Sequence, residues 1–270
     1  MYLAEVGRHE PFACSRGASP VTNLCEDMPI PRGAVRGISF DYGHVLAGLD
    51  LHELCERLRE GPGGPPSLGT LRSAMPAAYR AHDDAIAAGL GHEGGWRALM
   101  ATLVAAGGSH PEAADAQEAV QSLWRAQPMR NLWRDVPEEA RALLAGLEHA
   151  GVPMVITSNS EGRVAELIAE VGLAHHFRAI LDSGVLGYGK PETRIFALAA
   201  ERLEIPLASM VHVGDSEAAD IVGAHRAGAF AIRFDGFVPG AEARPTEADV
   251  RVSGFTELRV ALGEALGLAS

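Results

Sequence analysis

The stretch VRGISFDYGHVL, residues 35–46, decides the fold of this chain. An apolar, β-prone run ends at the carboxylate of Asp41, and Gly43 then allows the backbone to turn sharply. This pattern predicts a buried strand that delivers one aspartate to its carboxyl end. In open α/β sheets, ligands bind at the carboxyl ends of strands, so Asp41 is a candidate nucleophile or metal ligand. The alternative is that Asp41 only forms the turn or caps a helix, because aspartate readily hydrogen-bonds to the nearby backbone.

From Pro137 onward, strand-like and helix-like segments alternate. Short β-prone runs predict strands at residues 152–157, 179–181, 209–213, 229–234 and 249–252. Amphipathic runs between them predict helices at residues 137–149, 164–171, 195–203 and 217–226, with a glycine-rich loop at 184–189. The alternation predicts an α/β fold, a Rossmann-like doubly wound parallel sheet with helices on both faces.

The segment between these two regions follows a different pattern. Apolar residues recur at helical spacing across residues 49–130, which predicts an inserted helical domain. The α/β core is therefore expected to comprise residues 35–48 and 131–270. Residues 1–34 show neither period and carry Pro, Gly and Ser throughout, which predicts a loose extension, with Met28 as a candidate translation start.

The composition excludes several classes of protein. The 270 residues are 47% hydrophobic, enough for a full core, and a formal charge of -12 with scattered basic residues argues against a nucleic-acid partner. No run approaches the roughly 18 apolar residues of a membrane span, and no apolar signal segment opens the chain, so a cytoplasmic protein without a membrane partner is expected. The three cysteines form neither a paired framework nor a metal motif and are expected to be reduced.

Three of the predicted strands end in residues that can carry chemistry. They are Asp41, the pair Ser158 and Asn159, and Asp215, which Asp220 follows five positions later. Parallel strands place their carboxyl ends at one edge of the sheet, so these groups can converge. Two carboxylates can hold a hard cation such as Mg²⁺, and the cation and a hydroxyl can offset the charge of a phosphate. The pattern therefore predicts metal-assisted phosphoryl transfer.

Lys190 is the only lysine in a chain with 23 lysine and arginine residues. A compact ammonium can contact a nucleophile and a phosphate oxygen together, where a planar guanidinium would fit differently. Such a charge would also keep Asp41 ionised. The alternative is that one lysine precedes Pro191 by chance. Taken with the residues at the strand ends, Lys190 is a candidate phosphate ligand.

Four segments resemble, in order, the four motifs of the haloacid dehalogenase (HAD) superfamily: ISFDYGHVL, VITSNS, GYGKPETRIF and VHVGDSEAADIVGAHRAG. The similarity extends from about Val35 to Leu266. It implies that Asp41 is the nucleophile that forms an aspartyl-phosphate, and that Ser158 and Lys190 bind the transferred phosphoryl group, with Asn159 beside them in the catalytic set.

The same resemblance implies a metal site and a cap. Asp41, the backbone carbonyl of Gly43, and Asp215 would hold Mg²⁺, with Asp220 supporting the metal directly or through water. The helical insertion resembles a type C1 cap, which in this family closes over the site and selects substrates. The implied function is that of a Mg-dependent phosphatase for a small phosphorylated metabolite.

The sequence departs from the family pattern at Gly43. Phosphatases of this superfamily usually carry a second aspartate there as general acid and base, and such a group is worth roughly 10²- to 10⁴-fold in rate. His44 is a candidate substitute, because the ordinary pKa of histidine lies near neutrality. The alternative is that His44 only forms the turn or contacts the cap.

Other functions stay open within the same fold. A haloacid dehalogenase also lacks an aspartate at position 43, but the carboxylate of Asp215 is not needed to displace halide. Phosphonate cleavage through a cap Schiff base needs a cap lysine, which residues 49–130 lack. A sugar-phosphate mutase needs the missing acid and base. A non-catalytic phospholigand-binding or regulatory protein would keep the fold without turnover. The retention together of Asp41, Ser158, Lys190 and Asp215 weighs against it.

Overall fold

The computed structural model describes residues 30–237 and 244–268, and it contains one six-stranded parallel sheet. The strand order is β3-β2-β1-β4-β5-β6, and every neighbouring pair is parallel. The strands are β1 (Gly37–Phe40), β2 (Met154–Ser158), β3 (Ala179–Asp182), β4 (Met210–Gly214), β5 (Phe230–Phe234) and β6 (Val250–Val252). The predicted α/β fold is confirmed, and all six predicted strands form.

The strand order places β1 at the centre of the sheet. Phe40 is in register with Ile156 of β2 and with Val213 of β4. The chain moves from β1 to β2 and β3 on one side, and then returns past β1 to β4, β5 and β6 on the other. The order therefore reverses beside β1, and a crevice at the carboxyl end of such a switch point is the usual ligand site of this architecture.

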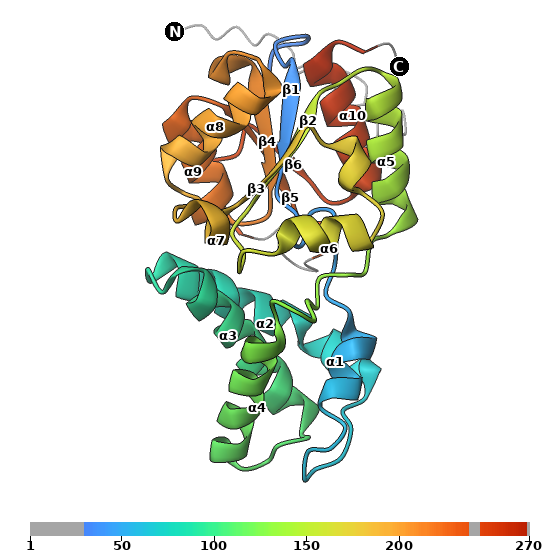
Figure 1. Ribbon diagram of the computed structural model, residues 1–270, viewed down its shortest axis with the longest axis vertical. Coiled ribbons are helices and arrows are strands. Elements are labelled where there is room, and N and C mark those ends of the chain that lie inside the picture. Colours follow the sequence, from blue (N-terminus) through green and yellow to red (C-terminus); the bar gives the residue numbers. More distant parts are fainter. Residues whose placement is uncertain (1–29, 238–243, 269–270) are drawn as a thin grey trace, which may run out of the picture.

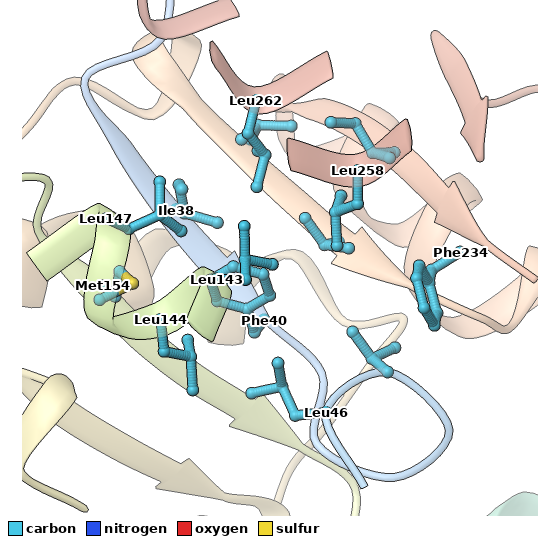
Figure 2. Packing of buried hydrophobic residues seen from close by; sticks show 14 of the residues in the cluster. Ile38, Phe40, Leu46, Leu143, Leu144, Leu147, Met154, Phe234, Leu258 and Leu262 are labelled. Atoms are coloured by element: carbon cyan, nitrogen blue, oxygen red, sulfur yellow. The ribbon is translucent and has the colours of Figure 1, made fainter. Parts of the chain in front are cut away.

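Helices cover both faces of the sheet (Figure 1). One face packs against α5 (Glu138–His149), α6 (Val164–Glu170) and α10 (Phe255–Leu266), and the other packs against α8 (Thr193–Leu203) and α9 (Val222–Ala227). Figure 2 shows the first layer, where leucines of α5 and α10 surround Ile38 and Phe40. Because side chains alternate along a strand, Ser39 points to the opposite face. Shorter elements complete the core: α7 (Ser183–Leu186), η1 (Ala174–His176), η2 (Leu207–Ser209) and the π-helical turn η3 (Glu217–Ile221).

A separate group of helices lies beyond the carboxyl end of the sheet (Figure 1). It consists of α1 (Leu51–Arg57), α2 (Leu68–Ala87), α3 (Gly91–Gly107) and α4 (Ala113–Ala126). These helices bury their own apolar cluster, including Leu54, Tyr79, Trp96 and Leu99. Two linker segments join these helices to the core. The linkers contact each other, since the amide of Gly48 donates to the carbonyl of Asp135 over 2.8 Å.

Three expectations need correction or extension. The predicted loose extension does not reach residue 34, because Ile30 is only 1% exposed in the core and Arg32 pairs with Glu264 at 2.6 Å. Residues 1–29, with the candidate start at Met28, lie outside the described part. The predicted loop at 184–189 begins as α7, since Asp182 Oδ1 accepts the Gly184 amide at its first turn (2.9 Å). The helix predicted at 217–226 begins as η3 before it continues as α9. No helix in the described ranges is long and apolar enough to cross a membrane.

Candidate active site

The residues predicted at the strand ends meet around one cavity at the centre of the sheet edge. Asp41 directly follows β1, and its amide donates to the Val213 carbonyl over 2.8 Å. Ser158 ends β2, and Asp215 directly follows β4. Asn159, Lys190 and Asp220 line the same cavity, which encloses about 690 Å³ of empty space including its open mouth. The structure thus brings together every side chain that the sequence analysis singled out for the site.

Lys190 lies at the floor of this cavity and is only 6% exposed. Its Nζ lies 3.0 Å from Asp41 Oδ1 and 2.6 Å from Asp220 Oδ1, so it bridges the two carboxylates. An ammonium has three N–H donors, so with two carboxylate contacts it keeps one for a ligand oxygen. Burial favours a neutral amine, but the charges of Asp220 and Asp41 outweigh it and raise the pKa of Lys190.

Asn159 positions the backbone of Lys190. Its Oδ1 accepts the Lys190 amide and its Nδ2 donates to the Lys190 carbonyl, each over 2.9 Å. The side chain of Asn159 therefore clamps the lysine loop onto the end of β2, which is a positioning role. The hydroxyl of Ser158 lies beside it on the cavity wall, and no described protein group hydrogen-bonds to it.

Asp220 is fully buried and anchors the other end of the lysine contact. Besides Lys190, its Oδ1 contacts His212 Nε2 at 3.0 Å, and its Oδ2 accepts the Ser216 amide at 2.9 Å. Burial raises the pKa of this carboxyl, but Lys190 and His212 outweigh burial and hold the pKa of Asp220 well below its usual range. Gly214 makes the approach possible, because a Cβ at that position would lie 2.2 Å from Asp220 Cβ.

His212 belongs to a buried polar chain that the sequence analysis did not find. Its Nδ1 lies 2.9 Å from Ser39 Oγ, which in turn lies 2.8 Å from Thr157 Oγ1. These three side chains come from β4, β1 and β2 and are fully buried. Fixed polar neighbours of this kind orient a buried carboxylate. His212 is thus placed to hold Asp220, and through it Lys190.

The carboxyl groups of Asp41 and Asp215 both have raised pKa values. Burial, opposed by Lys190, raises the pKa of Asp41 to about 6. Burial and the charges of Asp220 and Asp83 raise the pKa of Asp215 to about 7. Oxygens of Asp41, Asp215 and Asp220 all lie within 4.8 Å of one another. The two buried carboxylates and the partly exposed Asp41 face one ammonium, so the donor set and its excess negative charge suit a hard divalent cation.

His44 lies under the helical insertion in a left-handed backbone conformation (φ 60°). Its Nδ1 lies 3.4 Å from Asp215 Oδ2, and its ring centroid lies 4.2 Å from that of Tyr79 and 5.3 Å from that of Trp133. Burial and the nearby His82 hold the pKa of His44 well below its usual value. A neutral imidazole contacts the insertion here but is not a ready proton donor.

Trp133 occupies the space where a side chain at position 43 would stand. A Cβ built on Gly43 would lie 2.8 Å from both Cδ1 and Nε1 of the indole. The departure from the family pattern at Gly43 is therefore matched by a bulky neighbour 90 positions later in the chain. Nothing along the chain links Trp133 to Gly43, so the sequence alone does not point to this contact.

The helical insertion supplies the outer wall of the cavity, through His82 and Ile86 of α2, His92 of α3 and Gln127 after α4, and Asn131 follows where the chain returns to the core. Side-chain contacts also tie it to the core. His92 Nε2 lies 3.0 Å from Glu161 Oε1, and Arg244 pairs with Asp83. These residues carried no sequence signal, since no motif or spacing along the chain connects them.

A family model described as haloacid dehalogenase-like hydrolase matches residues 45–228. A phosphoserine phosphatase from Thermus thermophilus is 30% identical over 253 residues, which cover 90% of this chain and 96% of that protein. A phosphoglycolate phosphatase from Neisseria meningitidis is 42% identical over 95 residues, or 35% of this chain and 40% of that protein. Among solved structures, the HAD-hydrolase YfnB from Bacillus subtilis, bound to magnesium, has a TM-score of 0.63 at 20% identity and covers 84% of this chain and 98% of its own. That likeness shows the fold.

Proposed function

The chain belongs to the haloacid dehalogenase-like hydrolase family, and from this premise we propose that it is a Mg²⁺-dependent phosphatase acting on a small phosphorylated metabolite through an aspartyl-phosphate on Asp41. The observation that carries the proposal is the convergence of Asp41, Ser158, Lys190 and Asp215 on one cavity. Phosphatases named among the relatives, for phosphoserine and for phosphoglycolate, support the reaction class.

The contacts of Asp41 select one of its oxygens as the nucleophile. Oδ1 accepts the Tyr42 amide at 2.7 Å and lies 3.0 Å from Lys190 Nζ. No donor among the described residues contacts Oδ2, which is free to attack. In that step the new bond joins Oδ2 to phosphorus, the bond from phosphorus to the leaving oxygen breaks, and the leaving group departs with the electron pair. Water then hydrolyses the acyl phosphate and restores Asp41.

The transferred phosphoryl group would lie between Lys190 and Ser158. The ammonium of Lys190 would contact one phosphoryl oxygen, and the Ser158 hydroxyl, without a protein partner, would donate to another. Mg²⁺ would be held by Asp41, the Gly43 carbonyl and Asp215, with Asp220 supporting it directly or through water. When bound, the cation supplies positive charge that neutralises the phosphoryl oxygens in the transition state.

We further propose that residues 49–130 act as a cap over a core formed by residues 35–48 and 131–270. The separate apolar cluster of α1–α4 and the cross-contacts from His92 and Arg244 support this division. A closed cap excludes water and strengthens the electrostatic contacts beneath it. Action in the cytoplasm on a free metabolite, with no nucleic-acid partner, stays a prediction of composition and charge.

The test is release of inorganic phosphate from 4-nitrophenyl phosphate by the purified protein, with MgCl₂ and with excess EDTA. We expect phosphate release with MgCl₂ and none with EDTA. Asp41→Asn should abolish this activity, and Asp135→Asn should retain it. Asp135 is an exposed carboxylate outside the cavity, and thus a matched control. Absence of phosphate release under every condition would overturn the proposal in favour of a non-catalytic phospholigand-binding protein, and activity unchanged by EDTA would overturn the metal assignment.

A further inference from the structure

The cavity carries an excess of negative charge beyond what one phosphate and its cation need. Four carboxylates line it: Asp41, Asp215, Asp220 and Glu161. Among the described lining residues, Lys190 is the sole lysine or arginine. That ammonium already lies between Asp41 and Asp220. A substrate phosphate would use this charge and that of a divalent cation, and no positive charge would be left for a second anionic group.

Basic side chains around the cavity are already matched with carboxylates. Arg244 pairs with Asp83, and its other nitrogen lies 3.6 Å from Asp84. His92 Nε2 lies 3.0 Å from Glu161, and His82 Nδ1 lies 3.3 Å from Asp83. Recruiting Arg244, or the paired nitrogen of either histidine, to a substrate anion would break an existing pair, which offsets the gain.

One part of the cavity lining is uncharged. Ile86 and Leu167 contribute apolar surface, and Trp133 contributes an indole face. Gln127 Oε1 accepts the Leu132 amide at 3.3 Å, and Asn131 Oδ1 accepts the Trp133 amide at 2.8 Å. With their oxygens engaged, both amides retain NH₂ groups that can donate to a hydroxyl or carbonyl oxygen.

Building on the proposed phosphatase function, we infer that this site takes monophosphates whose leaving group carries no carboxylate or second phosphate, and presents instead an apolar or aromatic face with neutral oxygen acceptors. A second anion would have to shed its water beside four carboxylates without gaining a cation. An uncharged leaving group avoids that cost and matches Trp133, Ile86 and the two amides.

A matched pair of aryl phosphates tests this inference: 3-carbamoylphenyl phosphate and 3-carboxyphenyl phosphate. The two have the same shape and differ by one charge. We expect kcat/KM to be roughly 10- to 100-fold higher for the carboxamide, because like charges juxtaposed at a binding surface are strongly disfavoured. Raising the ionic strength should narrow this ratio, since salt screens repulsion. Equal kcat/KM values, or a preference for the carboxylate, would overturn the inference while leaving the phosphatase proposal intact.

A charge introduced on the insertion provides the second arm. Ile86→Lys places an ammonium on the cavity wall, and Ile86→Met is the uncharged control of similar length. The lysine variant should raise kcat/KM for the carboxylate substrate relative to the carboxamide by about tenfold, and the methionine variant should not. If neither compound were turned over, the phosphatase proposal would fail. Calorimetric binding of the same pair would then decide the charge inference, with tighter binding of the carboxamide supporting it and equal or weaker binding overturning it.

Discussion

Replacing Asp215 with asparagine should stabilise the metal-free protein at alkaline pH. The folded chain keeps the Asp215 proton up to about pH 7, because burial and Asp220 raise its pKa from 3.8 to about 7. The unfolded chain releases the same proton near pH 3.8. Between these values the folded state binds more protons, so its stability falls as pH rises. The stability contributed by protonated Asp215 is fully present below its pKa in the unfolded chain. It is lost as the pH rises through its pKa in the folded chain.

The magnitude follows from the size of the shift. A pKa shift of about 3 units corresponds to a loss of about 4 kcal/mol in the free energy of unfolding. This loss is complete once the pH is above the folded-state pKa of about 7. Asparagine carries no charge and escapes this cost, apart from the weak 3.4 Å contact with His44. The advantage of Asp215→Asn should therefore shrink by about 3 kcal/mol between pH 8 and pH 5. In melting temperature this is a difference of roughly 5 to 10 °C for a chain of this size.

The assay is urea or thermal unfolding in EDTA at pH 5 and pH 8, with wild type, Asp215→Asn and the exposed control Asp135→Asn. Added MgCl₂ should stabilise wild type at pH 8 and should leave Asp215→Asn nearly unchanged, since the variant lacks an anionic ligand. If Asp215→Asn were less stable than wild type at pH 8 without metal, or if its effect were equal at both pH values, the electrostatic reasoning would be refuted.

Two further variants probe side chains that act through others. His212→Leu removes one partner of Asp220 and should lower kcat by roughly 10- to 100-fold with little change in KM. His212→Gln can still donate to the carboxylate and should restore part of the rate. Equal losses of kcat in both variants would contradict a positioning role. Gly43→Asp alone should destabilise the protein by about 1 to 3 kcal/mol without a gain in rate, because the new Cβ would lie 2.8 Å from Trp133. Combined with Trp133→Ala, it should speed alkyl phosphates by up to about 10²-fold relative to Trp133→Ala alone, and aryl phosphates less, as steady-state rates over a leaving-group series would show.

The sequence was sufficient for the fold because its signals are local. The apolar runs typical of strands and the apolar spacing typical of helices each lie within a single element. All six strands predicted from them form the parallel sheet. Parallel strands share one carboxyl edge, so the convergence of Asp41, Ser158 and Asp215 also followed from the pattern. Local signals were wrong where tertiary contacts prevail, as at Ile30, which packs into the core from a segment without any period.

Contacts between different elements of the fold decided the character of the site. The steric match of Gly43 with Trp133, the hold of His212 on Asp220, and the clamp of Asn159 on Lys190 each join residues that no spacing rule connects. The raised pKa values of Asp41 and Asp215 likewise arise from burial and from charges brought together by the fold. Hydrophobic periodicity records which way a side chain faces within its own element, whereas the neighbour it meets there depends on how elements pack. The sequence alone therefore determined the sheet and the residues at its edge. Only the tertiary structure decided which side chains position one another, which exclude one another sterically, and which shift one another's pKa.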